Sequence, residues 1–179
     1  MNIVNIYTDG SAEKLNKSNA LAKLGIGAYC EYNGVEYSLS MLCDETMLAK
    51  YGITSTEVSN PTAEFVAFNE TLDILRSINI PGGKINPNLI LRFHIDYIGI
   101  GKWVRNEWKA NKDYIRKLRD FALDAIVSVG CVIDIVHVKG HCGIKGNELA
   151  DQFAFAGRTN TEVKGKYMSM KELSLALIK

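Results

Sequence analysis

The chain has 179 residues, enough for one domain whose core needs no disulfide or structural metal. Hydrophobic residues make up 47% of it and charged residues 23%, which is ordinary for a globular protein and excludes a disordered chain. The formal net charge of +1 argues against a protein that coats nucleic acid through bulk charge, but it leaves room for a local basic surface.

Three absences in the sequence bear on its compartment. No apolar run follows a basic N-terminal segment, so no signal peptide is visible. No stretch of about 18 apolar residues is long enough to span a membrane. The four cysteines lack metal-ligand spacing, which is typical of reduced thiols. We therefore expect a cytoplasmic protein that does not associate with membranes.

Three segments near the N-terminus are rich in β-branched and aromatic residues, which favour strands. They are residues 3–8, 27–32 and 35–41. Asn33-Gly34 separates the last two, and Asn-Gly between such segments is a strong hairpin signal. An Asp-Gly pair, Asp9-Gly10, ends the first segment. Although an isolated Asp-Gly is more often only a turn, we expect an antiparallel sheet whose first strand delivers a carboxylate at its C-terminal end.

Residues 42–61 form a long connection, with a short helix expected near 46–51. Because long connections are unusual in compact domains, this one is either functional or an insertion. Apolar residues at spacings of 3 and 4 then predict a helix over 62–77, with Glu64 near its start. The helix dipole favours an acid in the first turn, so Glu64 alone is weak evidence for catalysis.

Strands and helices alternate in the second half of the chain. Strands are expected at 89–95 and 132–138, with one helix or two over 99–121 between them. Asp96 follows the first of these strands directly, in the same kind of position as Asp9. This alternation implies parallel strands joined by right-handed helical crossovers.

Basic residues recur at spacings of 3 and 4 in the segment 99–121. They are Lys102, Arg105, Lys109, Lys112, Arg116 and Arg119. If the segment is one continuous helix, they form a stripe, with Trp103 and Trp108 interleaved. Basic and aromatic surfaces of this kind suit phosphates and sugars, although a basic stripe is at least as often only a solvated face.

A glycine-rich loop over 139–146 carries His141. Asn147 is expected to cap a helix that continues through Asp151 to Phe155. Near the C-terminus, a serine and a glutamate three residues apart predict a capping box for a last amphipathic helix, at 169 and 172. We expect one domain over 1–157, followed by a tail, 158–179, that contains this helix.

Four acids, two at strand ends and two on helices that pack on the sheet, are candidates for one cluster. They are Asp9, Glu64, Asp96 and Asp151. Clustered carboxylates raise one another's pKa unless a cation neutralises them. Sites made only of oxygen suit Mg²⁺ or Mn²⁺ rather than Zn²⁺. Because two such ions stabilise an in-line phosphoryl displacement, we expect metal-dependent phosphodiester hydrolysis.

The order and separation of four motifs resemble type 1 ribonuclease H along most of residues 1–157. The motifs are Thr8-Asp9-Gly10-Ser11, Thr62-Ala63-Glu64, Ile95-Asp96, and Val138-Lys139-Gly140-His141 with Gly146-Asn147-Glu148-Leu149-Ala150-Asp151. The resemblance implies an α/β fold with a five-stranded mixed sheet, in the spatial order 3-2-1-4-5, and helices on both faces. It also implies cleavage of the RNA strand of RNA/DNA hybrids, which leaves 3′-hydroxyl and 5′-phosphate ends.

The resemblance also implies a role for each residue. Asp9 matches the acid that bridges two Mg²⁺ ions, for which Mn²⁺ can substitute. Glu64 and Asp96 match ligands of the ion on the leaving-group side, and Asp151 matches a ligand of the ion on the attacking-water side. His141 matches a histidine that assists proton transfer or product release; its alternative is an ordinary loop histidine. The expected partner is an RNA/DNA hybrid, bound by a monomer.

Four residues are the expected substrate contacts: Ser11, Asn60, Trp103 and Lys109. The sequence departs from the family pattern after Asp96, where Tyr97 and Ile98 replace the usual serine and polar residue. Trp108 is one residue out of the usual spacing, and residues 109–114 leave little room for the basic protrusion of some relatives. These departures bear on affinity and cleavage-site preference rather than on the chemistry.

Two other functions were weighed. An actin-like or hexokinase-like phosphotransferase also begins with an Asp-Gly turn, but it would need a second comparable domain, for which 179 residues leave no room. A catalytically weak nucleic-acid-binding module of the same fold is the alternative to the nuclease, and the presence of all four acids argues against it.

Overall fold

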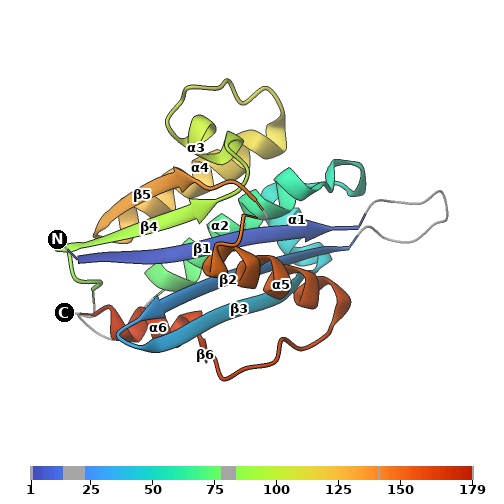
Figure 1. Cartoon of the computed structure of the whole chain (residues 1–179). Coiled ribbons are helices and arrows are strands. Elements are labelled where there is room, and N and C mark those ends of the chain that lie inside the picture. The colour runs from blue at the N-terminus through green and yellow to red at the C-terminus, as the bar shows by residue number, and fades with distance from the viewer. Residues whose placement is uncertain (1, 14–22, 78–83, 141, 179) are drawn as a thin grey trace.

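A six-stranded mixed sheet runs through the computed structural model, which describes residues 2–13, 23–77, 84–140 and 142–178. The strands are β1 (Asn2–Ala12), β2 (Leu24–Tyr32), β3 (Val35–Cys43), β4 (Leu89–Ile95), β5 (Val132–His137) and β6 (Met168–Ser169). Their spatial order is β5-β4-β1-β2-β3-β6 (Figure 1). The order predicted for the first five strands is confirmed. The sheet has six strands rather than five, because β6, with two residues too short for a periodic pattern, adds to the β3 edge.

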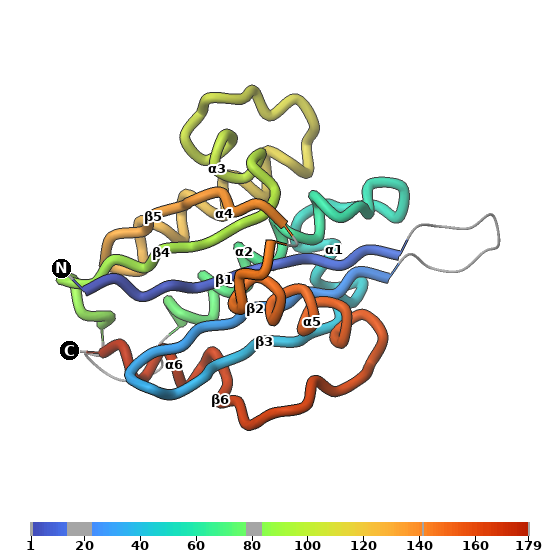
Figure 2. The backbone as a smooth tube through the Cα atoms, viewed as in Figure 1, coloured from blue at the N-terminus to red at the C-terminus, as the bar shows by residue number. Residues whose placement is uncertain are grey.

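Helices cover both faces of the sheet. They are α1 (Glu45–Tyr51), α2 (Asn60–Arg76), α3 (Gly99–Val104), α4 (Asp113–Ser128), α5 (Lys145–Thr159) and α6 (Met170–Ala176), with a 3₁₀ turn, η1 (Ser55–Glu57). α5 crosses β1, β2 and β3 on one face, while α2 covers the opposite face with α4 packed beside it (Figures 1 and 2). The central strand β1 therefore has a helix against each of its faces.

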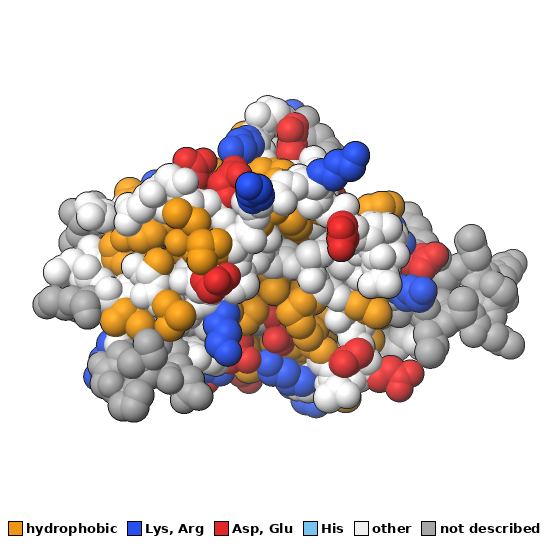
Figure 3. Space-filling view, turned by 90° about the horizontal axis from the view of Figure 1, so that it is seen from below, with side chains coloured by type: hydrophobic (Ala, Val, Ile, Leu, Met, Phe, Trp, Pro, Cys, Tyr) orange, Lys and Arg blue, Asp and Glu red, His pale blue; other side chains and the backbone are white. Residues whose placement is uncertain are grey.

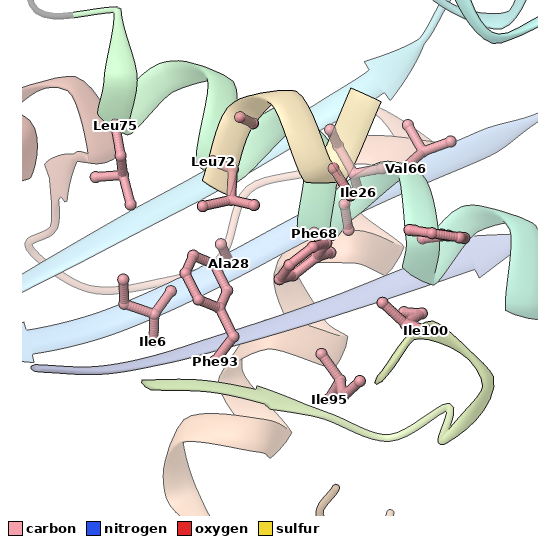
Figure 4. Packing of buried hydrophobic residues seen from close by; sticks show 14 of the residues in the cluster. Ile6, Ile26, Ala28, Val66, Phe68, Leu72, Leu75, Phe93, Ile95 and Ile100 are labelled. Carbon is pink, nitrogen blue, oxygen red and sulfur yellow. The ribbon is translucent and has the colours of Figure 1, made fainter. Parts of the chain in front are cut away.

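The main core lies between the sheet and α2. Val4 and Ile6 are buried in β1 at alternate positions, as one face of a strand requires. Phe68 of α2 meets Phe93 of β4 edge to face, with ring centroids 5.0 Å apart. Leu72 lies on the same side of α2, one turn further along (Figure 4). The apolar period seen in residues 62–77 is thus confirmed as the core-facing side of a helix.

Local backbone signals explain where several elements begin and end. Asn33 and Gly34 both have positive φ, 52° and 76°, as the predicted two-residue hairpin turn requires. α2 starts two residues earlier than expected, because the Ser59 side chain accepts a hydrogen bond from the Thr62 N–H. The prediction that Asn147 caps α5 is wrong: α5 begins at Lys145, so Asn147 lies inside the first turn.

The segment 99–121 does not form one helix. α3 ends at Val104 and α4 begins at Asp113, and Asn106 has a φ of 58°, which no helix continues through. The continuous basic stripe is therefore wrong. Several of its members pair locally with acids instead: Lys102 and Arg105 with Glu107, Arg116 with Asp113, and Arg119 with Asp120.

The long connection after β3 is held by buried polar contacts. It contains α1, which the side chain of Asp44 caps and which Gly52 ends with a positive φ of 65°. The Tyr51 hydroxyl donates to Glu70 Oε1 at 2.5 Å, and Lys50 Nζ lies 2.9 Å from the same oxygen. These bonds attach α1 to the middle of α2, so the connection is a packed part of the fold.

The last helix, α6, also contributes to the core. Ser169 and Glu172 form the predicted capping box. Leu173 is completely buried, and the Asn86 N–H donates to the Leu177 carbonyl at 2.9 Å. α6 packs on α2 and β3, so residues after 159 close one end of the main core.

The side of the molecule that carries β3 and β6 is seen in Figure 3, where hydrophobic side chains line a hollow between charged ones. β6 pairs with β3 only at Tyr37 and Ser38, which leaves the rest of that strand edge without a strand partner among the described residues. Within those residues, no helix is long and apolar enough to cross a membrane.

Replacing Leu173 by alanine tests whether α6 belongs to the core. We expect Leu173→Ala to lower the free energy of unfolding by about 2–4 kcal/mol, because it removes buried surface and leaves a cavity. Leu175→Ala, in the same helix but at a residue 46% exposed, should cost less than about 0.5 kcal/mol. Urea unfolding followed by circular dichroism measures both, and equal losses would contradict the docking of α6.

Candidate active site

Asp9 and Asp96 occupy neighbouring positions where β1 and β4 separate. Thr8 and Ile95 are the last pair of the parallel ladder, so each acid takes the next position along its strand. β1 itself continues beside β2 to Ala12, so the expectation that Asp9 ends its strand is wrong. Asp9 is only 8% exposed, and the Gly10 N–H donates to its Oδ1 at 2.7 Å.

Glu64 reaches this point because α2 and β1 touch through their backbones. A Cβ atom at Gly10 would lie 2.1 Å from the carbonyl carbon of Ala63 and 2.2 Å from the nitrogen of Glu64. Only glycine permits so close a contact. The Glu64 side chain is buried there, and the Tyr97 N–H donates to its Oε2 at 2.7 Å.

The charges of these three acids act on one another. Burial raises the pKa of the Glu64 carboxyl, and the negative charges of Asp9 and Asp96 raise it further, to about 8. The hydrogen bond from the Tyr97 N–H acts in the opposite direction but does not outweigh them. The structure thus brings Asp9, Glu64 and Asp96 into one electrostatic cluster, as the sequence predicts.

α5 crosses the sheet at the level of Asp9. Gly27 is the partner of Asp9 in the ladder with β2, and a Cβ at Gly27 would lie 2.2 Å from the Ala150 carbonyl oxygen. Asp151, the next residue of α5, is therefore beside the cluster in backbone position. Its half-buried side chain borders a depression of about 500 Å³ that Gln152 and Phe155 also line.

The loop after β5 closes against Asp96. The Gly140 N–H donates to Asp96 Oδ1 at 3.2 Å, and a Cβ at Gly140 would lie 2.1 Å from Asp96 Oδ2. This contact was not foreseen, although the glycine-rich composition of the loop was a signal for it. His141 follows Gly140 directly but lies outside the described residues, so its catalytic role stays a prediction.

These residues can hold divalent ions if their donor atoms are of the right type and lie close enough together. Carboxylate oxygens are the ligands that Mg²⁺ and Mn²⁺ prefer, and the excess negative charge that raises the pKa of Glu64 is what a cation would relieve. In the part of the chain that the structure describes, however, no three His, Cys, Asp or Glu side chains converge closely enough to hold a metal. The donors therefore fit in kind and charge, and ion binding requires their side chains to move closer.

Two of the four predicted substrate contacts are already bonded within the fold. Ser11 Oγ accepts a hydrogen bond from Arg158 Nε at 2.9 Å, and Asn60 Oδ1 accepts one from the Ala12 N–H at 2.9 Å. Trp103 stacks on Phe65. Lys109 is exposed in the segment between α3 and α4. Arg158 was missed because nothing in the sequence links residue 158 to β1.

Comparison with known proteins identifies the family. The RNase H family model matches residues 1–159. A ribonuclease H from Actinobacillus pleuropneumoniae serotype 5b (strain L20) is 31% identical over 166 residues, which cover 89% of this chain and 93% of that protein.

Solved structures of RNase H1 proteins share the fold. RNase H1 from the halophilic archaeon Halobacterium salinarum NRC-1 has a TM-score of 0.57 at 17% identity, covering 89% of this chain and 99% of that one. LC11-RNase H1 in complex with an RNA/DNA hybrid has a TM-score of 0.55 at 16% identity, covering 83% and 94%. The α/β fold is thus RNase H-like. With the family match, the chain belongs to the RNase H family, which is a family of nucleases.

Glu64→Gln tests the electrostatic cluster without metal. With its pKa raised to about 8, Glu64 keeps its proton in the folded protein up to about that pH, whereas the unfolded chain releases it near the ordinary glutamate pKa of 4.5. Wild-type stability should therefore fall as pH rises between these values, and Glu64→Gln should escape that loss. In EDTA at about pH 9 the variant should be more stable by a few kcal/mol, since one pKa unit corresponds to about 1.4 kcal/mol.

Urea unfolding of both proteins in EDTA at about pH 5, 7 and 9 measures the difference. If the two stability curves run parallel over this range, the buried acids do not interact as described. Glu172→Gln, at an exposed carboxyl in α6, is the control and should leave the wild-type pH dependence of this window unchanged.

Proposed function

We propose that this protein hydrolyses the RNA strand of RNA/DNA hybrids in a reaction that depends on two divalent ions, Mg²⁺ or Mn²⁺. The observation that carries the proposal is the burial of Glu64 beside Asp9 and Asp96, which raises the pKa of its carboxyl to about 8. Burying like charges together costs free energy, and a bound cation would offset that cost, so the cluster is a candidate cation site. The family match supports the same reaction, as does the LC11 relative solved with a hybrid.

In this proposal Asp9, Glu64, Asp96 and Asp151 hold the ions. When bound, these ions stabilise the charge on the attacking and leaving oxygens of an in-line displacement, which leaves 3′-hydroxyl and 5′-phosphate ends. The chain's own contribution is orientation, because three of the carboxylates each accept a backbone N–H, from Gly10, Tyr97 and Gly140. His141, next to Gly140, is proposed to assist proton transfer or product release.

The hybrid would lie across the cluster and touch Ser11, Asn60, Trp103 and Lys109. Of the six residues of the predicted basic stripe, Lys109 and Lys112 are the two that pair with no acid in the described part of the chain, so their charge is available to phosphates. We also propose a monomer that acts in the cytoplasm. The cysteines, all of them free thiols, are compatible with that reducing compartment.

One observation favours the second candidate, a catalytically weak module that binds nucleic acid. As the side chains stand, the described acids do not converge on a common metal position. A module of this kind would bind a hybrid without cutting it. Incubation with labelled RNA/DNA hybrid, double-stranded RNA and double-stranded DNA, in Mg²⁺ and in EDTA, separates the two candidates. Only the nuclease cuts, only the hybrid is cut, and only with Mg²⁺.

Asp9→Asn should lower hybrid cleavage by more than about a hundredfold, since even partners outside the first shell of a metal contribute 10- to 100-fold. Its stability in EDTA should be unchanged or higher, because one repelling charge is gone. Initial cleavage rates and urea unfolding give the two values. A clear loss of stability in EDTA would contradict the acid cluster, and retained cleavage would contradict the role of Asp9.

Lys109→Ala combined with Lys112→Ala tests the basic surface. We expect KM for the hybrid to rise and kcat to be spared, because phosphate contacts contribute binding rather than chemistry. The slope of log KM against log salt should flatten by about 1–2, since each phosphate contact contributes about 0.9. Lys171→Ala, on the distant α6, is the control. An unchanged slope in the double variant would mean that the two lysines are only solvated.

A further inference from the structure

The side chain of Asn147 has a buried oxygen atom that accepts no hydrogen bond from the described part of the protein. The residue is only 4% exposed, and its Oδ1 has no hydrogen-bond partner in the structure as described. Leaving a buried acceptor unpaired destabilises a fold, so buried polar atoms nearly always have a hydrogen-bond partner. An unpaired buried oxygen therefore needs an explanation, and a bound group that donates a hydrogen bond to it is one.

The position of Asn147 directs attention to the acid cluster. It lies in the first turn of α5, four residues before Asp151, so the two side chains share one face of the helix. Its neighbour Gly146 packs on the Tyr7 ring, where a Cβ would lie 2.3 Å from ring carbons. Tyr7 and Asp9 are two residues apart in β1, so their side chains lie on the same face of the sheet. Asn147 is therefore buried in the first turn of a helix that packs on the strand carrying Asp9.

A purely structural role is not supported by the contacts of Asn147. It does not cap α5, because the helix begins two residues earlier. Asn69 offers the comparison: it is also buried and its Oδ1 is also unpaired, but its Nδ2 donates to the Leu118 carbonyl at 2.9 Å and so joins α2 to α4. In the described part of the chain Asn147 makes no such side-chain bond between elements, and its unpaired amide oxygen lies on the helix that carries the predicted ligand Asp151.

We propose that Asn147 is a positioning residue of the metal site, whose Oδ1 accepts a hydrogen bond from the hydration shell of a divalent ion held by the acids. Mg²⁺ keeps several waters when it binds proteins, and these need acceptors. An amide oxygen provides one without adding to the negative charge already gathered at Asp9, Glu64 and Asp96. The inference rests on the metal dependence of the proposed function and adds a fifth residue to it.

The test measures thermal stability of the full chain in EDTA and during titration with MgCl₂ alone. An ion that binds only the folded state raises Tm. Asn147→Leu, which keeps the size and removes the acceptor, should have a Tm in EDTA equal to or above that of the wild type. Its half-maximal Mg²⁺ response should need about tenfold more Mg²⁺, the usual effect of losing an outer partner of a metal site.

Asn147→Asp keeps the shape and adds a charge, so it remains informative if the leucine variant does not fold. Its Tm should fall in EDTA and respond to less Mg²⁺ than the wild type. Asn69→Leu is the matched control: it should lower Tm in EDTA through the lost bond to Leu118, with an unchanged Mg²⁺ midpoint.

The outcomes separate the inference from the function on which it rests. If the wild type responds to Mg²⁺ and both Asn147 variants respond at the wild-type midpoint, the inference is overturned and the metal dependence stands. If Asn147→Leu loses as much stability in EDTA as Asn69→Leu, Asn147 is structural. A wild type whose Tm ignores Mg²⁺ overturns the metal-dependent function and this inference together.

Discussion

The backbone contact between β1 and α2 at Gly10 is the constraint on which the candidate site depends. It lets the start of α2 lie directly on the central strand and so places a buried glutamate against an aspartate of that strand. A second glycine contact, at Gly27, does the same for α5 on the opposite face. The two contacts draw helices from both layers toward one point on β1, and the separation of β4 from β1 adds Asp96 there.

Bringing acids together in this way costs stability, and the rest of the fold offsets that cost. The main core is continuous from β1 through α2 to α4 and α6. The long connection after β3, which no strand or helix of the central sheet requires, is fastened by Tyr51 and Lys50 to the buried Glu70. α6 closes the far end of the same core with Leu173. The contacts that stabilise the fold are thus concentrated around α2, the helix that carries Glu64.

Much of the site was visible in the sequence because its signals are local. A strand that contains Asp-Gly, a helix with an acid near its start and a strand followed at once by Asp96 are each recognisable within a few residues. The errors arose where the backbone conformation, rather than the pattern of residue types, decides the outcome. The basic stripe failed because the backbone turns at Asn106, after which Arg105 and Lys102 meet Glu107. The cap assigned to Asn147 failed because α5 begins at Lys145, which places Asn147 inside the first turn.

The sequence by itself determined the α/β class, the hairpin at Asn33-Gly34 and the acids to examine, because period, turn chemistry and motif spacing are properties of neighbouring residues. The order of the first five strands was implied by the resemblance to type 1 ribonuclease H. Only the tertiary structure decided that β1 runs on past Asp9, that Ser11 is bound by Arg158, and that Asn147 keeps an unpaired oxygen. These facts depend on contacts between residues far apart in the chain, and burial, which sets both the pKa of Glu64 and the cost of an unpaired amide, exists only once those contacts have formed.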